Sequence, residues 1–375
     1  MLFMFDYRRP VYRKVLVFLN ILTIIAYLLV CLVPFIDTGT NWLVALPGLG
    51  FPIIFFALLF FIILWIILKS KWLLVSVIAL LLGVQQIAAV FSFHFQKEFV
   101  SNKKPNSLRI FHWNLESWGK DLDKINNGDR GFKPYMMDVI DGEDADILCF
   151  EEYSDLENIT DSSSNASALV KLGFPYYLVE PTENVSGDIT RGVAIFSKYP
   201  IIDSGSFSYG RHTQAEHLIY IDINRGKDTF RIFTTHLQSV RFEQADFQSL
   251  SRLKRARDPG YADSRDLVSK LKRAYWYRYL QAQIVKQKIA ESPYPAVITG
   301  DFNDVPNSNT YFTIKGNLQD AFLKKGSWIG RTYRYISPTL RIDYILADKK
   351  FKVNQFQVIH VPYSDHFPIE ADLQY

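Results

Sequence analysis

Val297-Ile-Thr-Gly-Asp-Phe-Asn303 is an apolar run that ends in a carboxylate and an amide. A short apolar run of this kind, bounded by a glycine, is typical of a buried β-strand. Its polar residues, Asp301 and Asn303, would then lie where the strand leaves the core. The stretch therefore predicts both a sheet and a candidate functional edge of that sheet.

Other apolar runs end or begin in the same way, with acids, amides or imidazoles. They are Ile110-Phe-His-Trp-Asn114, Asp146-Ile-Leu-Cys-Phe-Glu-Glu152 and Phe233-Thr-Thr-His236. Two further polar clusters are Arg341-Ile-Asp343, at another predicted strand, and Ser364-Asp-His366, near the C-terminus. If these strands lie side by side, their polar ends converge on one patch. Oxygen ligands of this kind suit a hard cation such as Mg²⁺ or Mn²⁺, and histidines can move protons. Together with amides that bind phosphate oxygens, these groups are what phosphoester hydrolysis requires.

Short β-type runs recur beyond residue 107, with helical patterns between them at Pro134–Asp141 and Ala274–Glu291. This alternation predicts an α/β or α+β sandwich. The expected strands are Leu108–Trp113, Ile147–Phe150, Gly192–Phe196, Leu218–Ile223, Thr229–Thr235, Ala296–Thr299, Arg341–Leu346 and Phe356–His360.

Taken in chain order, the polar clusters resemble the motifs of the endonuclease/exonuclease/phosphatase superfamily, which includes DNase I, repair nucleases and neutral sphingomyelinases. Arg191-Gly-Val-Ala-Ile-Phe-Ser-Lys-Tyr-Pro200 is similar to an internal strand of the same superfamily. The resemblance runs from Leu108 to the C-terminus. It implies a four-layer α/β sandwich with two central sheets and a site at one edge. It also implies a hydrolase of phosphoester bonds that uses Mg²⁺ or Mn²⁺.

The resemblance assigns the metal ligands. Glu152 would be the principal ligand, with Asn114 and Asp365 beside the cation. Family members commonly carry Gln before the metal-binding Glu, whereas this chain has Glu151. Because neighbours in a strand face opposite ways, Glu151 is expected to point away from the cation or to tune its affinity. Glu116 follows Asn114 by two positions and is a candidate for contact with the ligands.

The resemblance also assigns the catalytic groups. His366, oriented by Asp343, would activate water, and Asp301 would position or deprotonate it. The division of labour between Asp301 and His366 stays open. Asn303 and His236 would contact the phosphoryl oxygens, with His236 a candidate proton donor to the leaving group. The histidines outside these motifs, among them His112, are interpreted as structural or surface residues.

The N-terminal part of the chain is dominated by apolar stretches at about residues 15–35, 44–68 and 72–93. Each is long enough to cross about 30 Å of hydrocarbon as a helix. A cleaved signal peptide is disfavoured for the first stretch because it is too long and two more follow. We therefore expect a membrane anchor over residues 1–95 with three transmembrane helices, a linker over 96–107 and a catalytic domain over 108–375.

The basic residues near the apolar stretches predict the orientation of the chain. They precede the first stretch and separate the second from the third, whereas the loop between the first and second carries only Asp37. By the positive-inside rule, the N-terminus and the second loop are cytoplasmic. The protein would be a multi-pass integral membrane protein with an extracytoplasmic catalytic domain. The basic residues are Arg8, Arg9, Arg13, Lys14, Lys69 and Lys71.

A basic segment over residues 241–278 carries ten basic and five acidic side chains, and it lies between the His236 and Asp301 strands. One interpretation is a solvated helical hairpin. The other is a surface for anionic lipid headgroups or a polyanionic substrate. The candidate residues of that surface are Arg252, Lys254, Arg255 and Arg257.

The sequence thus predicts a membrane-anchored, divalent-metal-dependent phosphoesterase. A lipid-linked phosphoester fits the tether, and extracytoplasmic DNA or RNA fits the basic segment, so both substrate classes stay open. A net charge of +4 is too small to imply nucleic acid by itself. Two cysteines exclude a disulfide framework. A non-catalytic membrane scaffold is disfavoured because every motif residue is present. The expected partners are the phosphoester substrate and membrane lipids, and no protein partner is evident.

Overall fold

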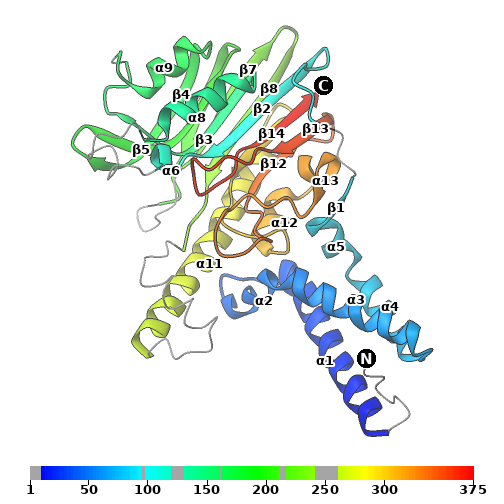
Figure 1. Ribbon diagram of the computed structural model, residues 1–375. Helices are drawn as coiled ribbons and strands as arrows, with labels where there is room; N and C mark the ends of the chain where they lie inside the picture. The colour runs from blue at the N-terminus through cyan, green and yellow to red at the C-terminus, as the bar shows by residue number, and fades with distance from the viewer. Residues whose placement is uncertain (1–9, 95–97, 120–130, 161, 211–216, 241–260) are drawn as a thin grey trace.

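Two mixed six-stranded sheets, packed face to face, form the centre of the protein in a computed structural model of the chain (Figure 1). The structure describes residues 10–94, 98–119, 131–160, 162–210, 217–240 and 261–375.

The first sheet has the strand order β13-β14-β2-β3-β5-β4, in which only β2 and β3 are parallel. Its centre, β2 and β3, contains the two motif strands of the first half of the domain. The strands are β2 (Ser107–Asn114), β3 (Ile147–Leu156), β4 (Tyr176–Ser186), β5 (Ile189–Ser197), β13 (Lys352–Val358) and β14 (Ile369–Gln374).

The second sheet has the order β10-β12-β9-β8-β7-β6, in which only β8 and β9 are parallel. It carries the His236, Asp301 and Asp343 motifs on three adjacent strands. The strands are β6 (Ile201–Phe207), β7 (Leu218–Arg225), β8 (Asp228–His236), β9 (Ala296–Asp301), β10 (Gln319–Asp320) and β12 (Asp343–Ala347).

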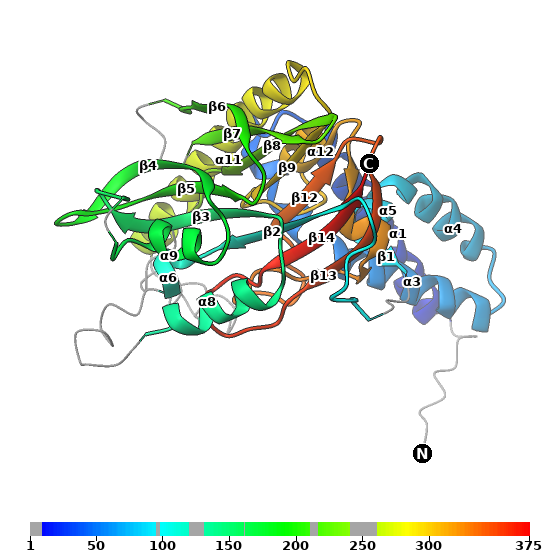
Figure 2. The ribbon, with the colours of Figure 1, turned by 90° about the horizontal axis from the view of Figure 1, so that it is seen from above.

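Helices cover the outer faces of both sheets, which gives four layers (Figure 2). Met136 on α8 and Leu169 on α9 pack against the first sheet, and Val285 on α11 and Ile314 on α12 pack against the second. A third apolar core fills the space between the sheets. The α/β sandwich predicted from the sequence is confirmed. The helices are α6 (Glu116–Gly119), α8 (Lys133–Gly142), α9 (Asn165–Lys171), α11 (Tyr261–Ala290), α12 (Asn309–Lys315) and α13 (Ala321–Lys325).

Each expected strand overlaps a strand of the structure, but several bounds differ; β3, for example, continues to Leu156 where the expected strand ended at Phe150. The run Arg341–Leu346 enters the sheet only at Asp343, and the run Phe356–His360 is the end of β13, which stops at Val358. The edge strands β4 and β6 and the strand β14 were not predicted. The expected linker ends one residue early, because Ser107 already belongs to β2.

Among the described residues, one helical segment is long and apolar enough to cross a membrane without a break. It is Val11–Phe35, formed by α1 (Pro10–Leu32) and the 3-10 turn η1 (Val33–Phe35). This agrees with the first expected span.

The second and third apolar stretches, which were expected as transmembrane helices over about residues 44–68 and 72–93, are each bent. The second bends by 59° near Gly50, and the third bends by 60° near Gly83. Pro52, which has no backbone N–H to donate, is the second residue of the helix after the first bend, Phe51–Ile67. The described part of the chain has up to three candidate spans if each bent pair crosses as one. The helical pieces are η2 (Trp42–Val44), α2 (Leu46–Leu49), α3 (Phe51–Ile67), α4 (Trp72–Leu82) and α5 (Val84–Val90).

The N-terminal helices are joined to the sandwich by polar contacts. Directly after α5, β1 (Ser92–Phe93) pairs with β11 (Ser327–Trp328) in a small antiparallel sheet. Nη2 of the buried Arg341 donates to the carbonyl oxygen of Ala89 at 2.8 Å. Two residues that were assigned to the anchor therefore form a strand with the sandwich, close to the strand that carries Asp343.

Candidate active site

The site is built from rows of side chains that face the space between the two sheets. On β2, Leu108 and Ile110 lie in the core between the sheets, and strand alternation puts Asn114 on the same face. On β9, Val297 lies in that core and Asp301 follows on the same face. Polar side chains therefore terminate apolar rows at one end of the sandwich, as the sequence predicted.

Strand register brings three motif residues together. Asp301 lies opposite Asp343 on the antiparallel β12 and opposite His236 on the parallel β8. Nε2 of His236 lies 3.6 Å from Oδ2 of Asp301. Across the gap between the sheets, Nδ2 of Asn114 donates to the same Oδ2 at 3.2 Å. Asp301 thus contacts side chains from both sheets, Asn114 from the first and His236 from the second.

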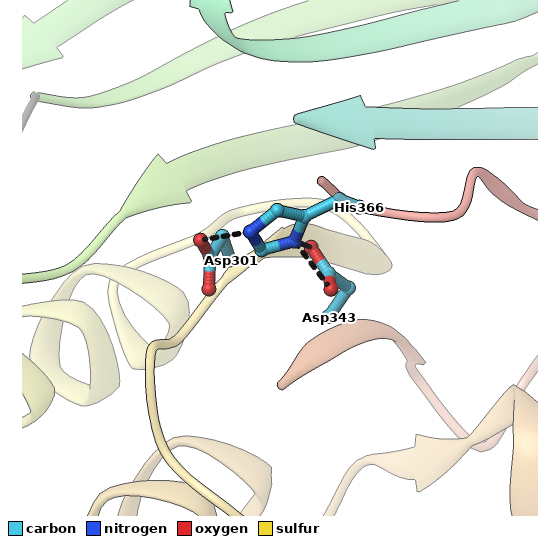
Figure 3. A group of neighbouring side chains, drawn as sticks. All are labelled: Asp301, Asp343 and His366. Atoms are coloured by element: carbon cyan, nitrogen blue, oxygen red, sulfur yellow. Dashed lines mark hydrogen bonds and ion pairs between the residues drawn. The ribbon is translucent and has the colours of Figure 1, made fainter. Parts of the chain in front are cut away.

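The ring of His366 lies between the carboxylates of Asp301 and Asp343 (Figure 3). Nδ1 of His366 lies 2.9 Å from Oδ2 and 3.1 Å from Oδ1 of Asp343. Nε2 on the other side of the ring lies 3.6 Å from Oδ2 of Asp301. One potential ligand atom from each of the three residues lies within 4.8 Å of the others. The cluster can therefore share a proton or contact a cation.

Burial and charge act in opposite directions on these groups. Burial alone would lower the pKa of His366, but the carboxylates of Asp343, Asp301 and Asp365 raise that pKa well above its usual value. Burial alone would raise the pKa of Asp343, but the facing His366 and the hydrogen bonds from His112 and His366 hold it below its usual range. Burial raises the pKa of Asp301, against the charge of His366. A buried imidazolium between two acids is thus stabilised by its neighbours.

Glu152 lies at a β-bulge that turns it out of the regular strand. The register between β3 and β5 shifts between Phe150 and Tyr153, and Glu152 has φ +46°. Its Oε2 lies 3.5 Å from Nη1 of Arg191, a residue that the sequence analysis quoted only as part of a strand. The bulge changes the direction of Glu152, whereas Glu151 stays fully buried in the regular part of the strand.

A short network ties Asp365 to the end of β2. The Asp365 N–H donates to Oε2 of Glu116 at 2.9 Å, and the Glu116 N–H donates to Oδ1 of Asn114 at 3.1 Å. Oδ1 of Asp365 lies 3.9 Å from Nε2 of His366. Glu116 is therefore hydrogen-bonded to two of the expected metal ligands, Asn114 and Asp365, and its role at the site stays a prediction.

Asn303 links the ends of β8 and β9. Its backbone N–H donates to Oδ1 of Asp301 at 2.8 Å, and its Nδ2 donates to the carbonyl oxygen of Leu237 at 3.0 Å. Nη1 of Arg278, on α11, donates to the carbonyl oxygen of Asn303 at 2.8 Å. Asn303 lies beside Asp301 as predicted, while Arg278 is a supporting residue that the sequence offered only as one member of a basic segment.

The structure places His112 at the site, but it does not describe the four basic residues that were predicted to form a substrate surface. His112 was set aside, yet its Nε2 lies 3.2 Å from Oδ1 of Asp343. Its position two residues before Asn114 on the same face was the available signal. Four other predicted residues, Arg252, Lys254, Arg255 and Arg257, lie outside the described residues, so their role stays a prediction.

Comparisons with known proteins agree with this geometry. The profile of the Endonuclease/Exonuclease/phosphatase family matches residues 125–366, more than half of the chain. A family described only as a domain of unknown function matches residues 13–90. No curated protein matches the chain.

Solved structures share the fold at low sequence identity. An endonuclease/exonuclease/phosphatase from Beutenbergia cavernae is 20% identical with a TM-score of 0.50, and the match covers 72% of each chain. The human Nocturnin catalytic domain, solved with a bound sulfate anion, is 19% identical with a TM-score of 0.50; the match covers 75% of this chain and 97% of that one. These likenesses concern the arrangement of the sandwich.

Proposed function

Because the chain belongs to the endonuclease/exonuclease/phosphatase family, whose members hydrolyse phosphoester bonds, we propose that it is a divalent-metal-dependent phosphoesterase held at a membrane surface. Its preferred substrate is a phosphoester carried on a lipid. The observation that supports the chemistry most directly is the His366 ring between Asp301 and Asp343.

The residues of this cluster divide the proton handling. Asp343 accepts from Nδ1 of His366 and thereby directs Nε2 toward Asp301. A water molecule that attacks phosphorus from this side loses its proton to the Asp301–His366 pair. His236, whose Nε2 also faces Asp301, is placed to give a proton to the leaving oxygen. General acid–base catalysis of this kind contributes about 10²–10⁴ in rate.

The donor set fits a hard cation. The oxygens of Asn114, Asp365 and Glu152 would hold it, because both oxygens of Asp343 already face His366. Carboxylate and amide oxygens are the ligands that Mg²⁺ and Mn²⁺ prefer. A bound cation would supply positive charge against the charge that develops on the phosphoryl oxygens.

The loop that follows Asp301 supports a lipid-linked substrate. Nδ2 of Asn307 donates to the carbonyl oxygen of Val30 at 3.0 Å, and Nδ2 of Asn309 donates to that of Pro34 at 3.0 Å. Both carbonyls lie in the last turns of the segment Val11–Phe35, which is apolar enough to cross a membrane. If that segment spans the bilayer, the site lies near the surface at which lipid headgroups are concentrated.

Nucleic acid is the second candidate substrate. The helix α11 contains the second half of the basic segment and contacts the Asn303 loop through Arg278. Exposed cations on it, at Arg265, Lys272 and Arg273, favour a polyanion, because basic residues near a cleft attract phosphates.

The experiment that separates these substrates uses the full chain, purified in detergent with Mg²⁺. Phosphodiester and phosphomonoester lipids in mixed micelles are compared with single- and double-stranded DNA and RNA and with a small soluble phosphodiester. The Asp301→Asn variant measures the background from contaminating enzymes. We expect kcat/KM to be highest for a lipid and to fall when the lipid is diluted in the micelle. Faster cleavage of nucleic acid than of any lipid contradicts the lipid assignment and favours the second candidate.

A further inference from the structure

A buried histidine lies directly behind the carboxylate that holds His366. His112 and Glu151 are both fully buried, and both face the space between the two sheets. Nε2 of His112 lies 3.2 Å from Oδ1 of Asp343, and Nδ1 lies 3.3 Å from Oε2 of Glu151. The imidazole is thus placed between two carboxylates, one of which belongs to the catalytic cluster.

This pair belongs to a polar chain that crosses between the sheets twice. Oε1 of Glu151 accepts from Oγ1 of Thr234 at 2.5 Å, and Oγ1 of Thr234 accepts from Oγ1 of Thr299 at 2.9 Å. His112 and Glu151 come from the first sheet, whereas Thr234, Thr299 and Asp343 come from the second. The two sheets therefore contact one another through hydrogen bonds directly beneath the site.

Packing alone does not account for this arrangement. The neighbours on the same rows are Ile110 on β2 and Cys149 on β3, both fully buried in an apolar core. An apolar residue at position 112 would continue that core without the cost of desolvating an imidazole. Nε2 of His112 instead makes a buried hydrogen bond to Asp343 across the two sheets, and such a bond fixes the relative position of its two partners. A histidine at position 112 is therefore better explained by its hydrogen bond than by its contribution to packing.

The group that it fixes is the carboxylate of Asp343. Oδ1 of Asp343 contacts both imidazole rings, through Nε2 of His112 and Nδ1 of His366. Oδ2 of Asp343 contacts the His366 ring, again at Nδ1. With His366 alone, the carboxylate could rotate about its last bond and take the ring with it. A second donor from the opposite sheet removes that freedom.

We propose that His112 is a positioning residue: held by Glu151, it orients Asp343 and, through Asp343, the ring of His366. This inference rests on the proposed function for its effect on rate. It also explains the departure at position 151, where family members commonly carry Gln. An acid suits this position because its neighbour at position 112 is an imidazole, whose Nδ1 lies 3.3 Å from Oε2 of Glu151.

The test compares His112→Leu with His112→Gln in the full chain. Leucine fills the space without a donor, whereas glutamine offers an amide nitrogen near the place of Nε2. On a soluble phosphodiester, we expect His112→Leu to lower kcat about 10- to 100-fold with KM almost unchanged. His112→Gln should recover much of that loss. In the Asp343→Ala background, His112→Leu should have almost no further effect, because His112 acts through Asp343.

The matched control is Ile110→Val, which removes one methyl group from the same row of β2. It should lower the melting temperature without changing kcat. If His112→Leu and Ile110→Val behave alike, or if the effects of His112→Leu and Asp343→Ala multiply, His112 is structural and the proposal is wrong.

A second measurement does not depend on activity. In ¹⁵N-histidine-labelled protein, the Nδ1 proton of His366, hydrogen-bonded to Asp343, should give a protected resonance that His112→Leu shifts or broadens and Ile110→Val leaves in place. An unchanged resonance in His112→Leu overturns the positioning role even if no phosphoester is hydrolysed. A changed resonance in an inactive wild-type protein would support the positioning role while the proposed function fails.

Discussion

Asp343 carries the chemistry of the site through its contacts with two histidines. Its oxygens face His366 and His112, and its own position is set by the β9–β12 register opposite Asp301. Because the carboxylate is buried and its pKa is held below the usual range, it stays charged and keeps the His366 ring oriented. The β9–β12 register thus fixes the position of Asp343, and Asp343 in turn fixes the orientation of the His366 ring.

Removing either member of the Asp343–His366 pair should abolish most activity without unfolding the protein. We expect His366→Ala and Asp343→Ala each to lower kcat about 10²–10⁴-fold, since general acid–base catalysis is lost. The matched control is His217→Ala, because His217 contacts Glu180 and Ser206 away from the cluster. A melting curve for each variant verifies folding. A folded His366→Ala variant with wild-type kcat would exclude His366 from the reaction.

The pH dependence of stability should depend on Glu370, a fully buried acid on β14. Burial raises the pKa of Glu370 to about 9, against the hydrogen bond from Gln357 and the charge of Arg109, whereas an ordinary glutamate titrates near 4.5. The folded state therefore holds a proton that the unfolded state has lost, so this group makes stability fall as pH rises from about 4.5 to about 9. Glu370→Gln should remove that fall, so the melting temperature of the variant should exceed that of the wild type increasingly toward pH 9. A difference in melting temperature between the two proteins that stays constant from pH 5 to pH 9 would contradict the assignment.

At the scale of elements, the sequence predicted the strands whose apolar runs end in polar motifs. β9 could be predicted because its apolar residues stop at Gly300 and Asp301. The edge strand β6 could not, because its residues include Ser204, Gly205 and Ser206, which show no continuous apolar signal. Propensity is a weak guide at sheet edges, where burial is partial.

The sequence pointed to Asp301, Asp343 and His366 but not to their contacts, and it set His112 aside. The period of a strand puts His112 on the same face as Asn114, but it does not say which residue lies opposite in the second sheet. Its partner Asp343 is 231 positions away in the chain. Sheet order and stacking decide that contact, and neither is encoded in a local pattern. The bend near Gly83 was missed for a related reason, since the apolar composition continues through it.

The contact between α2 and the loop after Asp301 is tight enough to test. A Cβ at Gly48 would lie 2.7 Å from the carbonyl oxygen of Asn307, so a side chain there forces the N-terminal helices away from the loop. We expect Gly48→Leu to reduce turnover of a lipid substrate several-fold more than turnover of a soluble one, because the loop that begins at Asp301 loses its support. The ratio of the two kcat/KM values is the measurement.

The matched control for Gly48→Leu is Gly142→Leu, since a Cβ at Gly142 would meet no atom within 4 Å. Gly142→Leu should leave the ratio unchanged. If Gly48→Leu also leaves the ratio at the wild-type value, the joint between the helices and the sandwich has no part in substrate choice.

At the scale of the whole molecule, the N-terminal helices and the sandwich form one connected structure. Arg341, two residues before Asp343, pairs with Asp320 at 2.7 Å and donates to Ala89 at the end of the helices. Figure 1 shows these helices on one side of the sandwich, below α12 and beside the lower part of α11. We infer that, if the segment Val11–Phe35 crosses a membrane, the membrane lies on this side of the sandwich.

Topology is the prediction that belongs to this scale. With three crossings and a cytoplasmic N-terminus, a reporter fused after Tyr375 should behave as exported. Pairs of fusions, one active only outside the cytoplasm and one only inside, measure the side directly. Additional fusions after Asp37 and after Ser70 should report the outside and the inside. A C-terminal reporter active only in the cytoplasm would mean that the number of crossings is even.

The central claim is that the cluster of Asp301, Asp343 and His366 hydrolyses phosphoesters with a divalent cation. The direct measurement is the hydrolysis of bis-para-nitrophenyl phosphate by the purified full chain in detergent, first in EDTA and then with Mg²⁺ or Mn²⁺ restored, with folded His366→Ala alongside. We predict no turnover in EDTA, recovery with the cation, and no recovery in His366→Ala. Full activity in EDTA, or equal activity in the folded variant, would contradict the account.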